Sequence, residues 1–239
     1  MIARKPLESK VALITGASRG IGLAIANTLS HLGAAVSICA RDAQKLESAS
    51  SELASSGAKV LAVVADVSRS ADVESLVLQT QNALGPIDIL VNNAGIGYFG
   101  PTHEAAEANW DTVLDTNLKS VFLLSKAVAP GMIQRRTGDI INIASLAGKN
   151  AFPGGGIYCA SKWGLLGLTQ CMAEDLRQYG IRVSAVCPGS VATDFGAHVG
   201  KDPQKMLQPD DIAHAVETLV TQAPQSFISE IVMRPTQKP

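Results

Sequence analysis

The sequence predicts one α/β domain built on a doubly wound, parallel sheet of seven strands, with helices on both faces. Three observations indicate this fold. Short apolar segments alternate along the chain with longer segments of helical periodicity. The apolar segments are apolar along their whole length, which is typical of parallel strands covered on both faces. No linker, repeat or low-complexity stretch divides the 239 residues, of which 46% are hydrophobic, so one large core is expected.

The elements follow from these segments in order. Strands are expected at 11–15, 35–40, 59–67, 87–93, 139–145, 181–188 and 229–235. Helices are expected where apolar residues recur at helical spacing between glycine-rich or polar turns. They are placed at 21–33, 42–57, 70–84, about 105–135, 158 to about 180, and 209–222. A turn is expected near Gly131 or Thr137–Gly138, and the last helix is expected to begin near Gln208 or Asp210.

Charge and cysteine usage narrow the class of protein. Lysine and arginine number 20 against 21 acidic residues, a balance that favours neither nucleic acid nor an anionic membrane as the main partner. MIARKPLESK at the start has no apolar core, and no apolar run has the length of a membrane span. The four cysteines and four histidines have no metal-ligand spacing, so no metal is expected and the cysteines are expected in the core. A cytoplasmic, reduced protein is the expectation.

A glycine-rich turn, TGASRGIG at 15–22, lies between the first expected strand and the first helix. Gly16, Gly20 and Gly22 permit a tight turn and a close backbone approach, and the helix N-terminus beyond them favours a phosphate. The spacing is GxxxGxG, which differs from the GxGxxG of the common dinucleotide fingerprint. The stretch predicts a nucleotide site, and a purely structural turn is the alternative.

The end of the second strand is where an adenosine ribose is expected to lie. An acidic residue there suits a free 2′-hydroxyl, whereas arginine suits a 2′-phosphate. Arg41 follows Ala40 at this position, and Arg19 stands in the glycine-rich turn. The two arginines favour NADP(H) over NAD(H). Asp42 is expected either to pair with Arg41 or to cap the next helix.

Tyr158 and Lys162 are four residues apart on an expected helix, so their side chains share one face, with about 6 Å between Cβ atoms. A free phenol has a pKa of about 10, and a neighbouring ammonium group favours the phenolate. We therefore expect Lys162 to lower the pKa of Tyr158. An ordinary surface pair on an amphipathic helix is the alternative interpretation.

In combination, these motifs resemble the short-chain dehydrogenase/reductase family over about residues 8–222. The resemblance is carried by TGASRGIG at 15–22, Asp66–Val67, NNAG at 92–95, Asn117, Ser145, YCASK at 158–162 and PGSVAT at 188–193. It implies a single-domain Rossmann fold and an NADP(H)-dependent oxidoreductase. Such an enzyme moves a hydride between the nicotinamide and a carbonyl or secondary alcohol. The 3-oxoacyl-carrier-protein reductases and the reductases of small hydroxy acids and semialdehydes are similar members.

The resemblance implies four catalytic residues. Tyr158 is the general acid that protonates the carbonyl oxygen, and Ser145 hydrogen-bonds that oxygen. Lys162 lowers the pKa of the tyrosine and binds the nicotinamide ribose. Asn117 holds a water that links the lysine to a proton relay. Two donors aimed at an oxygen that gains negative charge provide both general-acid and electrostatic catalysis.

The resemblance also implies the residues around the cofactor. Residues 66–67 flank the adenine, 93–95 line the adenosine ribose side, and the segment 188–193 contacts the nicotinamide. The full cofactor-binding set that it implies is Gly16, Ser18, Arg19, Gly20, Ile21, Gly22, Arg41, Asp66, Val67, Asn93, Ala94, Gly95, Tyr158, Lys162, Pro188, Gly189, Val191 and Thr193.

Two segments depart from the family pattern and bear on the substrate. The expected substrate lid, about 194–208, is short, and FISEIVMRPTQKP lacks the glycine-rich ending common in 3-oxoacyl-carrier-protein reductases. It looks more like the end of reductases of small hydroxy acids and semialdehydes. A 3-oxoacyl thioester, a small keto or hydroxy acid and a hydrophobic ketone all stay open as substrates. Seven apolar or aromatic residues are candidates for the lining of the substrate pocket, and ordinary core packing explains them equally well. They are Tyr98, Phe99, Pro101, Leu146, Phe152, Phe195 and Met206.

Two other functions fit parts of the sequence. GASRG at 16–20 matches the GxSxG nucleophile elbow, with Ser18 as a hydrolase nucleophile and His198 or His214 as its base. An elbow is expected after several strands, however, whereas this motif follows the first. A non-catalytic nucleotide-binding scaffold is the other alternative, although such proteins usually lack part of the tyrosine–lysine machinery.

The resemblance implies a homodimer or homotetramer built on two long helices, 105–135 and 157–179. The apolar residues Leu165, Leu166, Leu168 and Met172 suit such an interface, and burial inside the monomer explains them equally well. The expected partners are therefore a small-molecule carbonyl or alcohol substrate and further copies of the chain.

Overall fold

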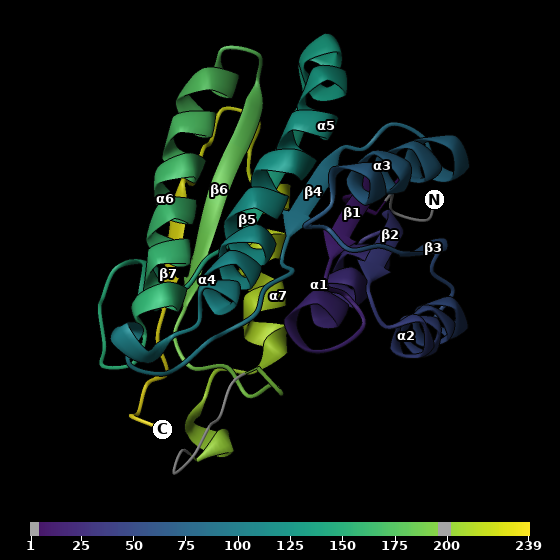
Figure 1. Cartoon of the computed structure of the whole chain (residues 1–239). Coiled ribbons are helices and arrows are strands. Elements are labelled where there is room, and N and C mark those ends of the chain that lie inside the picture. The colour runs from purple at the N-terminus through teal and green to yellow at the C-terminus, as the bar shows by residue number, and fades with distance from the viewer. Residues whose placement is uncertain (1–4, 196–201) are drawn as a thin grey trace.

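The computed structural model describes residues 5–195 and 202–239, in which seven parallel strands form the central sheet (Figure 1). The strands are β1 (Val11–Thr15), β2 (Ala35–Ala40), β3 (Val60–Val64), β4 (Ile89–Asn92), β5 (Gly138–Ile143), β6 (Ile181–Pro188) and β7 (Glu230–Met233). They lie in the order β3-β2-β1-β4-β5-β6-β7. The chain builds outward from β1 to β3, returns to the centre at β4 and builds outward again. The predicted doubly wound parallel sheet is thus confirmed.

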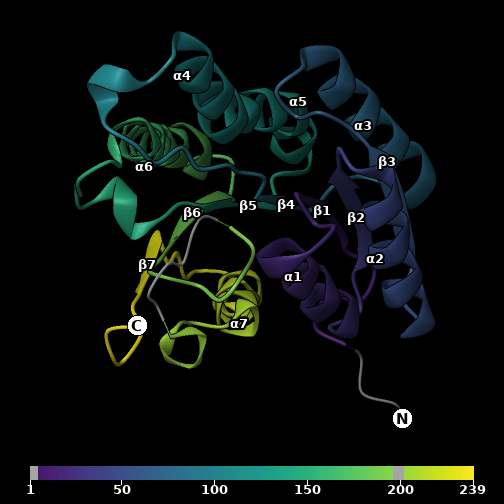
Figure 2. The same cartoon turned by 60° about the horizontal axis from the view of Figure 1, so that its bottom comes forward.

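Helices cover both faces of the sheet, as Figure 2 shows. One face carries α1 (Gly20–His31), α2 (Ala43–Ser55) and α7 (Pro209–Thr221), and the other carries α3 (Ser70–Leu84), α4 (Glu107–Leu114), α5 (Ser120–Arg135) and α6 (Gly156–Arg177). Neighbouring strand residues point to opposite faces, so Ala12 and Ile14 join the first core while Val11 and Leu13 join the second. The uniformly apolar strands follow from burial on both sides.

Side chains cap two helices at the edge that carries the cleft. Asp42 accepts a hydrogen bond from Lys45 N at 3.0 Å and begins α2, so it has the capping role of the two predicted for it. Gln208 and Asp211 form a reciprocal capping box on α7, which begins at Pro209. By contrast, α1 has neither a side-chain cap nor an acidic residue in its first turn. Its amino end therefore presents backbone N–H groups without a competing carboxylate.

The predicted helix at 105–135 is interrupted. Between α4 and α5 lies one π-helical turn, Asp115–Lys119, and a short 3₁₀ turn at Thr102–Glu104 precedes both. Gly131 lies inside α5, so of the two predicted turn positions the one near Thr137–Gly138 is confirmed and the one at Gly131 was wrong. The chain reverses at Arg136, whose φ of 55° ends α5 just before β5. Other predicted elements agree to within a few residues.

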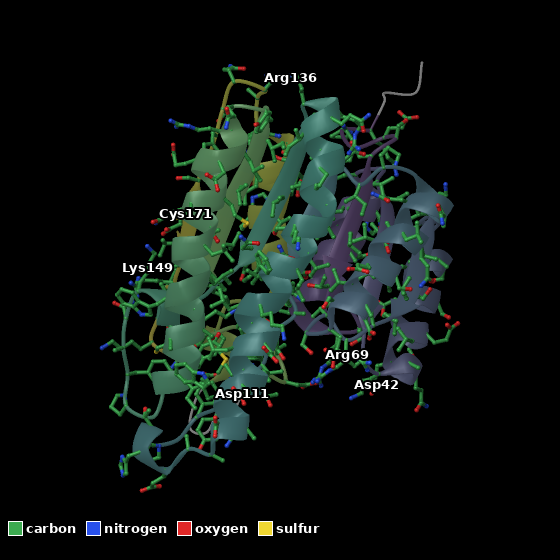
Figure 3. All side chains as sticks on the ribbon, turned by 45° about the horizontal axis from the view of Figure 1, so that its top comes forward. Asp42, Arg69, Asp111, Arg136, Lys149 and Cys171 are labelled. Carbon is green, nitrogen blue, oxygen red and sulfur yellow. The ribbon has the colours of Figure 1, made fainter. Side chains whose placement is uncertain are left out.

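Three of the four cysteines are buried, but Cys171 is exposed. Its side chain points outward from α6 (Figure 3). The prediction that every cysteine is a core residue was therefore wrong for Cys171, because this position falls on the outer face of the helix. Within the described residues, no helix combines the length and apolar character that crossing a membrane requires.

A buried polar chain crosses from the sheet to α6. Asn92 Nδ2 donates to Asn142 Oδ1 at 2.8 Å, and Asn142 Nδ2 donates to Thr169 Oγ1 at 2.8 Å. All three side chains are buried. Asn142 therefore satisfies one polar group on either side of it, in a place where water has no access.

We predict that Asn142→Ala lowers the free energy of unfolding by about 3–5 kcal/mol, because two buried groups lose a partner and a cavity forms. Urea denaturation measures this loss. The control is Ser125→Ala, since the buried Ser125 hydroxyl makes no hydrogen bond to any described residue. That change should stay within about 0.5 kcal/mol. Equal losses for the two variants would contradict the role of Asn142.

Candidate active site

A cleft of about 1350 Å³ runs along the sheet edge where the strands end. The residues that follow each of β1 to β6 contribute to it, because parallel strands all deliver their carboxyl ends to the same edge. Its middle lies at the switch point between β1 and β4. All predicted cofactor-binding residues line it except Gly22, and so do three of the four predicted catalytic residues.

The glycine-rich turn after β1 forms one wall of the cleft. Gly16 has a φ of 64°, and a Cβ on it would lie 2.9 Å from Ala94 Cα, so only glycine fits. Gly20, with a φ of 57°, opens α1. Gly22 instead packs the helix on the turn, since its Cβ would lie 2.5 Å from Gly16 O. A glycine cradle below an uncapped helix N-terminus fits a phosphate-bearing nucleotide.

Thr15 and Asn93 join this turn to the loop after β4. The Thr15 hydroxyl accepts hydrogen bonds from the backbone N–H groups of Asn93 and Ala94, both at 3.0 Å. Asn93 Nδ2 in turn donates to the carbonyl oxygens of Thr15 and Gly16, at 2.9 and 3.1 Å. Asn93 thereby fixes the separation of the two loops that border the centre of the cleft.

Basic residues gather at the end of the cleft beyond β2. Arg41 lines the cleft, and so does Lys45 from the first turn of α2, which sequence reasoning missed. Burial alone would raise the pKa of Asp66, but hydrogen bonds from Ser68 and the charges of Arg41 and Arg69 hold it below its ordinary value. The one sequence signal that could have identified Lys45 is its position three residues after the Asp42 cap, in the first turn of α2.

Arg19, which the sequence analysis grouped with Arg41, also lines the cleft, but its side chain pairs with an acidic residue. Its Nη1 atom forms an ion pair with Asp194 Oδ2 at 2.6 Å, and both side chains are exposed. The pair joins the glycine-rich turn to the segment after β6. Sequence reasoning missed Asp194, which is 175 residues away along the chain.

Tyr158, Ser145 and Lys162 meet at the other end of the cleft. Lys162 Nζ lies 5.9 Å from the centroid of the Tyr158 ring and donates to the carbonyl oxygen of Ile143 at 2.9 Å. Ser145 Oγ accepts from Ala147 N at 3.1 Å, which begins a 3₁₀ turn and holds the hydroxyl at the end of β5. Three polar groups thus share a pocket in which Tyr158 is only 8% exposed.

The pKa of Tyr158 differs from the sequence prediction. Burial raises it to about 12, although the Ser145 side chain lowers it in part. Burial also lowers the pKa of Lys162 to about 8. The expected lowering of the tyrosine pKa by Lys162 was therefore wrong for this structure, because desolvation outweighs the hydrogen bond of Ser145 and no lowering by Lys162 accompanies it.

Asn117 lies behind the cleft rather than in it, within the π-helical turn. Its side chain donates to Ile96 O and Ser161 Oγ, at 2.8 and 3.0 Å, and accepts from Ile96 N at 2.8 Å. A Cβ on Gly95 would lie 3.3 Å from Asn117 Oδ1 and 3.8 Å from Lys162 Nζ. Asn117 therefore holds the loop after β4 beside the buried lysine.

The candidate substrate residues divide into two groups. Phe99, Leu146, Phe152 and Phe195 line the cleft. Tyr98, Pro101 and Met206 do not, and Met206 is buried near the end of the expected lid. Of that lid, residues 196–201 lie outside the described residues, while Leu207 is hydrogen-bonded to Ser190 and Ala192.

The hydrolase alternative gains nothing from the geometry. Of the two histidines considered as bases, His198 lies outside the described residues. His214 is exposed on α7, pairs with Glu217 at 3.6 Å and does not line the cleft that holds Ser18. Ser18 has no histidine base among the described residues of the cleft.

Comparison with known proteins identifies the family of the chain. The family model described as short chain dehydrogenase matches residues 10–204. The 3-oxoacyl-(acyl-carrier-protein) reductase of Synechocystis sp. is 36% identical over 231 residues, which cover 93% of this chain and 94% of that protein. The glycine betaine reductase ATRR of Emericella nidulans is 36% identical over the whole of this chain, which spans only 20% of that protein. A metagenomic short-chain oxidoreductase, solved in complex with NADP, is 47% identical, with a TM-score of 0.87 and coverage of 97% of this chain and 100% of that one.

The burial of Lys162 predicts a pH-dependent stability. An unfolded lysine has a pKa of about 10.4, against about 8 in the cofactor-free native chain. Between these values the unfolded chain binds a proton that the native chain does not, so the free energy of unfolding rises as the pH rises from 8 to 10. At pH 7 the buried ammonium costs about 3 kcal/mol.

We predict that Lys162→Met stabilises the cofactor-free protein at pH 7 by about 1–2 kcal/mol, because loss of the charge outweighs the unpaired Ile143 carbonyl. The gain should disappear by pH 10. Urea denaturation at both pH values measures it, and Lys59→Met, at an exposed position, is the control. Destabilisation of equal size at pH 7 and pH 10 would contradict the prediction.

Proposed function

The chain belongs to the short-chain dehydrogenase family, and we propose that it moves a hydride between NADP(H) and the carbonyl carbon of a small-molecule substrate. The observation that carries this proposal is the meeting of Tyr158, Ser145 and Lys162 at one end of a cleft whose other end is a glycine cradle with basic residues. NADP in the related metagenomic oxidoreductase supports the cofactor. The name of the Synechocystis reductase supports reduction of a ketone.

The residues divide the chemistry between them. NADPH, when bound, supplies the hydride, and negative charge then develops on the substrate oxygen. The Tyr158 hydroxyl donates its proton to that oxygen, and the Ser145 hydroxyl donates a hydrogen bond to it. Lys162, one helical turn from Tyr158, stabilises the phenolate that remains and holds a ribose hydroxyl. Asn117 is a positioning residue that keeps the loop after β4 beside Lys162, and a water beside it would connect the lysine to solvent.

The basic end of the cleft would select the phosphorylated cofactor. Arg41 and Lys45 approach the place where the adenosine ribose is expected to lie, and both present donors suited to a 2′-phosphate. Arg19 would add to them on release from Asp194. Asp66 and Val67, in the loop after β3, would flank the adenine.

The proposal also includes the location of the protein in the cell and its oligomeric state. A cytoplasmic location agrees with four free cysteines. A homodimer or homotetramer agrees with the large apolar side chains exposed on the helices of one face, namely Trp110, Phe122 and Trp163. Leu165 and Leu166, by contrast, are buried within the monomer. Light scattering in solution measures the mass, and a monomer at micromolar concentration would contradict this assembly.

We predict that Tyr158→Phe abolishes NADPH-dependent reduction across a panel of ketones and aldehydes while NADPH still binds, because only the proton donor is lost. Absorbance of NADPH measures turnover, and quenching or transfer of fluorescence on binding measures affinity. A non-catalytic scaffold would instead show tight NADPH binding and no turnover in the unmodified protein. Turnover retained by the variant would refute the role of Tyr158.

We predict that Arg41→Ala weakens NADPH binding by about 1.5–3 kcal/mol and changes NADH binding little, because a charged hydrogen bond to the 2′-phosphate is lost. Titration of both cofactors measures the difference. Arg69→Ala is the matched control, since Arg69 also acts on the Asp66 carboxyl but does not line the cleft. An equal loss of affinity for NADPH and NADH would show that Arg41 does not bind the 2′-phosphate.

A further inference from the structure

Four aromatic rings surround the substrate end of the cleft: Phe99, Phe152, Tyr158 and Phe195, here called the aromatic wall. The Phe99 centroid lies 6.3 Å from that of Phe152 and 5.6 Å from that of Tyr158, which it meets edge to face. The Phe195 centroid lies 5.7 Å from that of Tyr158. These separations fall in the range of about 4.5–7 Å where aromatic rings attract one another.

The three phenylalanines of the wall keep much of their surface open to the cleft. Phe99, Phe152 and Phe195 are 46%, 43% and 36% exposed, whereas Tyr158 is almost buried between its neighbours. Large apolar side chains that line a concave site and stay exposed mark a place where a ligand buries apolar surface. The wall therefore offers a ligand three partly open rings, two of which, Phe99 and Phe195, adjoin the proposed proton donor Tyr158.

Glycines make room for these rings. A Cβ on Gly97 would lie 2.6 Å from Phe99 Cε2, and a Cβ on Gly155 would lie 2.5 Å from Phe152 Cζ. Each ring thus lies directly on glycine backbone. Gly100 N donates to Gly154 O at 2.9 Å, which ties together the two loops that carry these rings. The glycine backbone therefore helps to fix the positions of the Phe99 and Phe152 rings in the aromatic wall.

Most of the formal charge in the cleft belongs to its nucleotide end. The charged lining residues are Arg19, Arg41, Asp42, Lys45, Asp66, Lys162, Asp194 and Arg234. Most of them follow β1 to β3 at the nucleotide end, Asp194 pairs with Arg19, and Lys162 is buried and bonded to Ile143 O. The lining residues within 95–99 and 143–152 are all uncharged. Arg234, which follows β7, is the one exposed charge toward this side among the described residues.

We propose that the substrate is a neutral aryl ketone or aryl aldehyde, whose planar ring packs against Phe99, Phe152 and Phe195 while its carbonyl oxygen meets Tyr158 and Ser145. The inference rests on the proposed function and selects among the substrate classes that it allows. An aryl ring gains both apolar burial and edge-to-face contacts there. A carboxylate next to the reacting carbonyl, as in a small keto acid, would lose its hydration against these rings, and the lining residues within 95–99 and 143–152 offer it no cation.

The test compares two ketones of equal carbon number, acetophenone and cyclohexyl methyl ketone, with NADPH and the full chain. The kcat/KM ratio of the aryl to the cyclohexyl ketone is measured for each variant, so that the intrinsic reactivity of the two ketones cancels between variants. Phe99→Leu and Phe152→Leu should each lower this ratio about 3- to 10-fold, the loss of an aromatic contact. Phe227→Leu, at an exposed phenylalanine that does not line the cleft, should leave it unchanged.

Gly155→Ala is a second variant that changes no residue of the cleft lining. Its methyl group should displace the Phe152 ring, and it should lower the ratio in the same direction as Phe152→Leu. NADPH affinity and thermal unfolding, measured for every variant, separate this effect from damage to the fold or to the cofactor end.

The outcomes separate this inference from the proposed function. No turnover of any carbonyl compound by the unmodified protein would refute the proposed function. Turnover with the same aryl-to-cyclohexyl kcat/KM ratio in all wall variants would refute the aryl substrate but not the proposed function. A higher kcat/KM for benzoylformate than for its neutral methyl ester, in which the ketone is at least as reactive, would also overturn it, since the carboxylate would then be recognised, with Arg234 as the group to test. A preference for an acetoacetyl thioester over acetophenone would overturn it in favour of acyl-chain reduction.

Discussion

The hydrogen bonds between Thr15 and Asn93 are the constraint on which the cleft depends. The chain leaves β1 toward one half of the sheet and leaves β4 toward the other, so the two loops diverge where the nucleotide site opens. One hydroxyl and one amide join them through four hydrogen bonds. The glycine cradle and the loop that borders Lys162 therefore keep a fixed separation. The Ser145 and Tyr158 side chains, which lie just after β5 and on α6, are positioned relative to that frame.

Burial at this end of the cleft favours the uncharged forms of Tyr158 and Lys162. The pKa of Tyr158 lies at about 12 and that of Lys162 at about 8, both because burial penalises the charged forms. A phenol in this environment keeps its proton at neutral pH, which is the form that reduction consumes. The aromatic neighbours Phe99 and Phe195 pack beside Tyr158 and contribute to that dry environment while they line the cleft.

Much of the fold could be predicted from the sequence because its signals are local. An apolar run such as VALIT followed by glycines identifies a strand and its turn without knowledge of the rest. What could not be predicted depends on distant partners. The π-helical turn holds Asn117 against Ile96, 21 residues away, and Arg19 pairs with Asp194 across 175 residues. The pKa of Tyr158 had the wrong predicted direction because spacing along a helix contains no information on desolvation by other loops.

The exposed thiol of Cys171 allows this chain to be labelled at one site for fluorescence spectroscopy. The other three cysteines are buried, so a maleimide dye attaches at one place without any mutation. The thiol lies on the same helix as Tyr158, thirteen residues further on, which is about 20 Å along the axis. A dye there sits within energy-transfer range of the fluorescent reduced nicotinamide. Because the same helix belongs to the face proposed for assembly, its labelling rate would also report when a second copy covers it.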